Sequence, residues 1–142
     1  MNPKLRIIAA IMVIVHAVIA IFHGISHGGA GVALSFFGYS YVSIVVFLAP
    51  LLALLLLNMR LVQWGAWLLF FAMLGSFVYG VSFHFILLGS DNMTQVPLGA
   101  WNLPFQWSAV LLAISEAIGV GVGIWTVYEM GRRPAQQSGK QT

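Results

Sequence analysis

Residues 5–27 read LRIIAAIMVIVHAVIAIFHGISH. Most of these side chains are apolar, and a helix that crosses a lipid bilayer needs roughly 20 predominantly apolar residues. Three histidines interrupt the stretch, and they are His16, His23 and His27. The stretch therefore predicts a membrane-spanning helix that carries ionisable side chains.

Three further stretches are long and apolar enough to span a bilayer, and they cover residues 36–57, 61–88 and 105–129. Two of the three connections between spans are short, which favours an up-down order of helices. We therefore expect an all-α integral membrane protein, an up-down four-transmembrane-helix bundle with a single domain over residues 1–130. The polar residues 131–142 are expected to form a mobile tail.

The whole chain has the same apolar character. Of its 142 residues, 61% are hydrophobic and only 6% are charged, whereas a soluble domain carries about 25% charged residues. This composition excludes a soluble enzyme and a nucleic-acid-binding domain, and makes the lipid bilayer the first expected partner. The absence of cysteine excludes disulfides and thiolate metal sites.

The basic residues indicate the orientation of the chain in the membrane. They are Lys4, Arg6, Arg60, Arg132, Arg133 and Lys140. In a protein with four spans, all six lie on one side, and neither opposite loop, 28–35 or 89–104, contains lysine or arginine. The positive-inside rule then predicts that both termini are cytoplasmic. Compactness and the lack of organelle signals favour a prokaryotic plasma membrane.

The ionisable residues within the spans share the helix faces that pack against neighbours. At about 100° per residue, His16 and His23 lie about 20° apart, and His27 lies roughly 40° further round. His84 and Glu116 lie on faces of small residues that allow close helix packing. Because ionisable groups in a bilayer are costly, we expect all five to face the bundle interior.

The depth of these residues divides them into two groups. At about 1.5 Å per residue, His23 and His84 both lie about 6–8 Å below the outer ends of their spans. By the same arithmetic, His16 and Glu116 lie roughly 16–17 Å down, near the bilayer centre. The sequence predicts an outer tier of His23, His27 and His84, and a central tier of His16 and Glu116.

The outer tier has two chemical interpretations. Histidines four residues apart on a helix can present two ligands to one metal ion, and His84 would add a third nitrogen suited to copper, zinc or iron. Alternatively, His23 and His84 could be the axial ligands of haem b, since spans one and three would lie diagonally with space between them. The sequence leaves both cofactors open.

The central tier and the outer loop carry further hypotheses. Glu116 beside His16 predicts a proton-accepting pair that could serve a proton relay, although the two could also hydrogen-bond across helices and set their register. Connections as long as 89–104 are usually functional or held by a partner. We interpret its Asp91 and Trp101 as parts of a lid over the outer tier, or of a docking surface for another subunit.

Three functions follow from these sites. The leading hypothesis is a small membrane protein with a metal or haem site, serving as an accessory or electron-transfer subunit of a larger membrane complex rather than as an enzyme on its own. A second is a structural or assembly subunit that binds other helices, lipid or pigment without a cofactor. A third is a proton-coupled transporter that uses Glu116 and His16. No nucleic acid is expected as a partner, and a homo-oligomer is compatible with the sequence.

Overall fold

The computed structural model describes residues 1–138, with the side chains of residues 1–132, and this part of the chain contains helices but no strands. Four helical stretches are long and apolar enough to cross a membrane, which confirms the expected number. They are Pro3–Ala30, Phe36–Asn58, Val62–Ile86 and Asn102–Arg132.

The first span is a single helix, α1 (Pro3–Ala30), with a clear signal at each end. The Asn2 side chain accepts a hydrogen bond from the Lys4 backbone N–H at 3.0 Å, and Pro3 occupies the first turn, where no helical N–H partner is needed. At the other end, Gly31 adopts a left-handed conformation with φ of 68°, a common way for a helix to stop.

The second and third spans each contain a π-helical segment. The second consists of α2 (Phe36–Tyr41), the π-helix η1 (Val42–Leu48) and α3 (Ala49–Asn58). The third consists of α4 (Val62–Val81) and the π-helix η2 (Ser82–Ile86). Pi-helical turns are rare in proteins, but those that occur are often found at functional sites. Here η1 comes directly before Pro50, at the place where a proline kink is expected.

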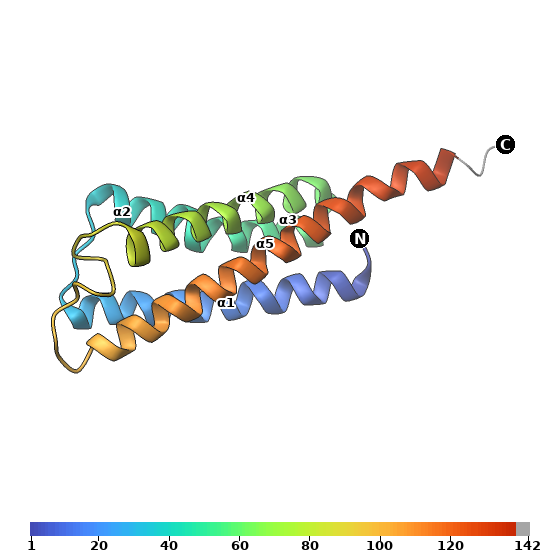
Figure 1. Ribbon diagram of the computed structural model, residues 1–142. Helices are drawn as coiled ribbons and strands as arrows, with labels where there is room; N and C mark the ends of the chain where they lie inside the picture. The colour runs from blue at the N-terminus through green and yellow to red at the C-terminus, as the bar shows by residue number, and fades with distance from the viewer. Residues whose placement is uncertain (139–142) are drawn as a thin grey trace.

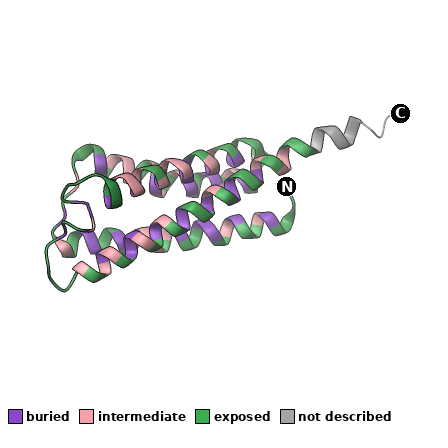
Figure 2. Ribbon diagram, viewed as in Figure 1, coloured by how far each residue is buried: buried purple, intermediate pink, exposed green. Residues whose placement is uncertain are grey.

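The last helix, α5 (Asn102–Ser138), packs along both α1 and α4, while α3 packs against α4 and α1. Thus α1 and α4 occupy opposite corners of the bundle. Close approach between α4 and α5 depends on Gly123, where a Cβ atom would lie 2.7 Å from the Cα of Phe70. Figure 2 shows the resulting pattern, with buried and exposed residues alternating along each helix.

The two ends of the bundle differ in chemistry. The loop between η2 and α5 and the turn after α1 lie together at one end, and the N-terminus and the C-terminal part of α5 lie toward the other (Figure 1). The half nearer the N-terminus is filled by an apolar cluster that includes Val13, Leu57, Leu69 and Met73. Three histidines, His23, His27 and His84, lie toward the loop end.

Residues 131–142 are expected to form a mobile tail, and the structure describes the first part of this segment as helix. The helix α5 continues to Ser138, so residues 131–138 are helical. Residues 139–142 lie outside the described residues, and the mobility of the tail stays a prediction.

The close contact between α4 and α5 predicts the effect of Gly123→Ala. The added methyl group would meet the backbone of Phe70, so we expect the free energy of unfolding to fall by about 1–3 kcal/mol, as in other overpacked cores. SDS titration of the protein in mixed micelles would measure this loss. Gly121→Ala is the control, because a Cβ there meets nothing within 4 Å. Equal stability of the two variants would contradict the packing.

Candidate metal centre

Three histidine side chains from two helices converge at the loop end of the bundle. His23 and His27 lie one turn apart on α1, and His84 comes from η2. All three side chains are buried, and one ligand nitrogen from each lies within 4.8 Å of the others. The Nε2 atom of His23 lies 3.1 Å from the Nε2 of His84 and 3.2 Å from the Nε2 of His27. These three buried histidines could hold a metal ion.

In His23 and His84, the Nδ1 atom makes a hydrogen bond that fixes the orientation of the ring. The Nδ1 of His84 donates to the backbone carbonyl of Asp91 at 3.0 Å. The Nδ1 of His23 lies 2.8 Å from the Oγ of Ser108, whose own hydroxyl donates to the Phe105 carbonyl. In this network both Nδ1 atoms carry the proton. The Nε2 lone pairs of His23 and His84 then face each other.

The carboxylate of Asp91 lies beside His27 and His84. The Oδ1 of Asp91 lies 3.1 Å from the Nε2 of His27 and 3.3 Å from the Nδ1 of His84. The Nδ1 of His27 contacts the Val32 carbonyl at 3.4 Å. A ligating histidine typically donates its second nitrogen to a carboxylate or a carbonyl, which fixes the ring. The contacts of His84 follow this pattern.

The loop that supplies Asp91 is fixed to the bundle by its own hydrogen bonds. The Met93 backbone N–H donates to the His84 carbonyl at 3.0 Å, and the Gln106 side chain donates to the Met93 carbonyl at 3.1 Å. The Asn92 side chain donates to the Leu87 carbonyl. These bonds hold Asp91 beside His27 and His84.

The second residue of the expected lid, Trp101, lies elsewhere. Its indole packs against Gly29 near the end of α1, where a Cβ atom would overlap the ring. Trp101 is not among the residues that line the cavity beside the histidines. It covers the end of α1, where Gly29 has no side chain and leaves room for the indole ring.

The expected pair of His16 and Glu116 is not formed. The Nε2 of His16 donates to the Val46 carbonyl at 2.9 Å, and its Nδ1 lies 3.3 Å from the Oγ of Ser115. Among the described residues, no hydrogen bond or ion pair joins His16 to Glu116. Ser115 and Glu116 project about 100° apart on α5, so Ser115 faces α1 while Glu116 faces Gly80 of α4.

The His16 contact also explains how the protein accommodates Pro50. Proline has no N–H to donate to the carbonyl one turn back, which belongs to Val46. His16 supplies a donor to this carbonyl from the neighbouring helix. The side chain of His16 therefore has a structural role.

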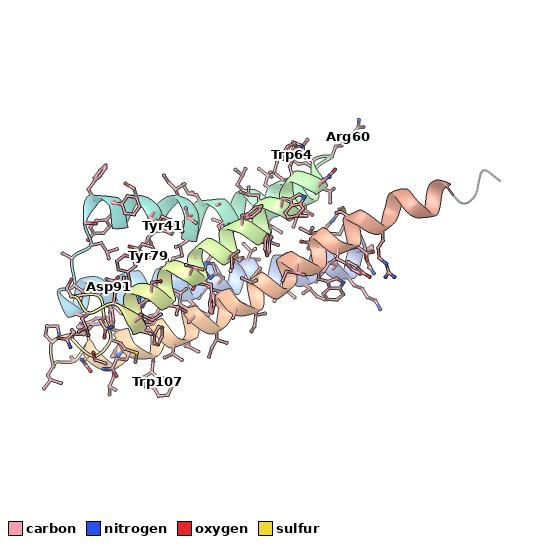
Figure 3. All side chains as sticks on the ribbon, turned by 45° about the horizontal axis from the view of Figure 1, so that its top comes forward. Tyr41, Arg60, Trp64, Tyr79, Asp91 and Trp107 are labelled. Carbon is pink, nitrogen blue, oxygen red and sulfur yellow. The ribbon has the colours of Figure 1, made fainter. Side chains whose placement is uncertain are left out.

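A cavity of about 270 Å³ leads from the histidine cluster to Glu116. Its polar lining residues include the three histidines and Asp91 at one end and Ser76 and Glu116 at the other. Apolar residues from α1, η1 and α5 and two tyrosines, Tyr39 and Tyr79, form the walls between them. Figure 3 shows Tyr41, Tyr79 and Asp91 toward the loop end, and Arg60 and Trp64 toward the other end.

Ser108 is a site residue that the sequence analysis missed. Ser108 and Ser115 lie seven residues apart on α5, and their partners His23 and His16 lie seven residues apart on α1. Because a step of seven returns to the same helix face, the two serines could have been matched to the two histidines in the antiparallel direction. This shared spacing was the available signal.

Comparison with known proteins gives no relative from which a function could be taken. No family model, no curated protein and no solved structure matches the chain. The function is therefore inferred from the geometry of the cluster and the cavity.

The contact between Trp101 and α1 predicts the effect of Gly29→Ala. The methyl group would displace the indole, so we expect faster amide hydrogen exchange in residues 87–101 and a loss of about 1–3 kcal/mol in the free energy of unfolding. Exchange followed by mass spectrometry would measure the first effect. Gly28→Ala is the control, because a Cβ there meets nothing within 4 Å. Unchanged exchange in Gly29→Ala would show that Trp101 does not anchor the loop.

Proposed function

We propose that this protein is a four-span membrane protein that binds one transition-metal ion between His23, His27 and His84. The observation that carries the proposal is the approach of the His23 and His84 Nε2 atoms to 3.1 Å, with the proton of each ring assigned to Nδ1. Two lone pairs at this distance repel unless a cation lies beside them. A metal ion would satisfy both and would draw in the Nε2 of His27.

The spacing of the nitrogens supports a single ion. Two nitrogens bound to tetrahedral zinc at about 2.0–2.1 Å are separated by roughly 3.3–3.4 Å. The cluster has separations of 3.1 and 3.2 Å, so only small movements would open it to this geometry. Haem b would require its macrocycle between the Nε2 atoms of His23 and His84, which here are in direct contact. The geometry favours an ion over haem.

Asp91 supports the same proposal as a fourth donor. Its Oδ1 is buried, and among residues 1–132 it has no hydrogen-bond donor other than the two imidazoles beside it. Three nitrogens and one carboxylate oxygen suit zinc, copper or iron. Imidazole must be neutral to bind a metal, so affinity is expected to fall in acid.

We infer that the helices are inserted in up-down order with both termini in the cytoplasm, which would place the centre in the outer half of the membrane. The position of all six basic residues before span one, between spans two and three, and after span four supports this orientation. An accessory subunit of a larger membrane complex is the role we propose for such a centre. Electron transfer by this chain alone is less favoured, because one site gives electrons no route across the bilayer.

Metal titration tests the proposed centre. We expect the metal-stripped, full-length protein in detergent to bind about one Co²⁺ ion, with the visible absorption of a tetrahedral site, and Zn²⁺ to displace it. His23→Ala and His84→Ala should each weaken binding by at least about 100-fold, beyond the effect of losing an outer-shell partner. His16→Ala is the matched control, since its ring contacts Val46 and Ser115 instead. Binding that survives both cluster variants would disprove the centre.

Cysteine labelling tests the orientation, because the natural chain contains no cysteine. On intact cells, a membrane-impermeant maleimide should label Gln95→Cys in the outer loop but not Met59→Cys in the turn between α3 and α4. Both side chains are exposed in the structure. After permeabilisation, both variants should react. Labelling of Met59→Cys alone on intact cells would reverse the proposed orientation.

A further inference from the structure

Glu116 is a buried acid. The residue is only 1% exposed, and its Oε2 atom has no hydrogen-bond partner in the part of the chain that the structure describes. Its neighbour across the helix interface is Gly80, where a Cβ atom would lie 3.1 Å from that oxygen. An ionised carboxylate in such a place is very unfavourable unless a cation compensates it, and it otherwise takes up a proton.

The cavity links this acid to the proposed metal centre. Glu116 lines the same cavity as His23, His27 and His84. Gly80, which it faces, precedes His84 by one helical turn, or about 6 Å along the axis. No hydrogen bond or ion pair joins Glu116 to the three histidines among the described residues. Its carboxylate would therefore act on a bound ion through space and not as a ligand.

The charges around the cavity suit a divalent ion. Neutral imidazoles contribute no charge, Asp91 contributes one negative charge, and Glu116 can contribute a second. No lysine or arginine is among the lining residues of this part of the chain. Glu129, the third acid in the sequence, lies near the other end of the bundle. In a low-dielectric site, two carboxylates neutralise a divalent ion, whereas Asp91 alone neutralises a monovalent one.

We propose that Glu116 is the counter-charge that selects divalent over monovalent ions, and that it exchanges a proton for the ion. This inference rests on the proposed metal centre. When the centre is empty, the Glu116 carboxyl group keeps its proton. When a divalent ion binds, the O–H bond breaks, the proton passes to solvent, and the carboxylate balances the second charge of the ion. No electron is transferred.

The other titratable groups on or beside the cavity do not supply this proton. Tyr39 from α2 and Tyr79 from α4 line the cavity, and Tyr41 stacks against Tyr79 without being a lining residue. A phenol ordinarily holds its proton to a pH of about 10. His16 of α1 has both ring nitrogens occupied, by Val46 and Ser115. The remaining titratable groups that line the cavity, His23, His27, His84 and Asp91, belong to the proposed centre itself.

Proton counting tests the exchange. Calorimetric titration of the full-length protein with Zn²⁺, in buffers of different ionisation enthalpy and about one unit above pH 6.5, gives the number of protons released. We expect wild-type protein to release about one proton more than Glu116→Gln. Glu116→Asp should keep the release, and Glu129→Gln, on the same helix but outside the cavity, should match the wild type. The infrared carbonyl band of a protonated carboxyl group should vanish from wild-type protein when Zn²⁺ binds.

A comparison of divalent and monovalent ions provides a second test. Glu116→Gln should weaken Co²⁺ binding by about 10- to 100-fold, the range for outer-shell partners of a metal, but should leave Ag⁺ binding within about twofold of wild type. Equal proton release by wild-type protein and Glu116→Gln, or equal loss of Co²⁺ and Ag⁺ affinity, would overturn the inference. If wild-type protein binds no ion through His23 and His84, the proposed centre itself fails. Binding that depends on those histidines but is insensitive to Glu116→Gln refutes only the counter-charge.

Discussion

The interior of a bilayer offers no water to hydrogen-bond a polar side chain, so such a group depends on partners within the protein. This constraint organises the molecule. His16 donates to a carbonyl of η1, His23 contacts a serine of α5, and His84 donates to the loop that follows it. Each contact joins two different elements of the bundle. The contacts that satisfy the buried histidines therefore also set how the helices and the loop fit together.

The same constraint explains the irregular helices. Pro50 cannot donate to the carbonyl of Val46, and the chain forms a π-helix just before it while His16 donates to the freed carbonyl. A second π-helix carries His84 and ends beneath the loop that holds Asp91. Both irregular segments line the one cavity that joins the histidine cluster to Glu116. Irregular backbone at membrane depth thus occurs here where it faces protein or a cavity, as the energetics of unsatisfied peptide groups require.

Much of the candidate site could be predicted from helix geometry. The periodicity of 3.6 residues places His23 and His27 on one face, and the axial rise brings His84 to the same depth. The same depth calculation also paired His16 with Glu116, whereas in the structure the His16 ring contacts Ser115 and the Val46 carbonyl. Depth alone does not distinguish Glu116 from Ser115, which differs from it by only one residue along the axis but by about 100° around it. Ser108 escaped notice because its signal lies only in the seven-residue spacing that it shares with Ser115, which matches the spacing of His16 and His23.

The sequence by itself determined that the chain has four apolar helices and that the histidines and Glu116 within them lie on packing faces, because length, composition and periodicity are local properties. Only the tertiary structure decided which side chains meet. The rotation of α5 against α1 turns Ser115 and not Glu116 toward His16, and the fold of the loop brings Asp91 and not Trp101 to the cluster. These pairings depend on the rotation of each helix about its axis and on loop closure. Both are set by the packing of all four spans together, which no single segment encodes.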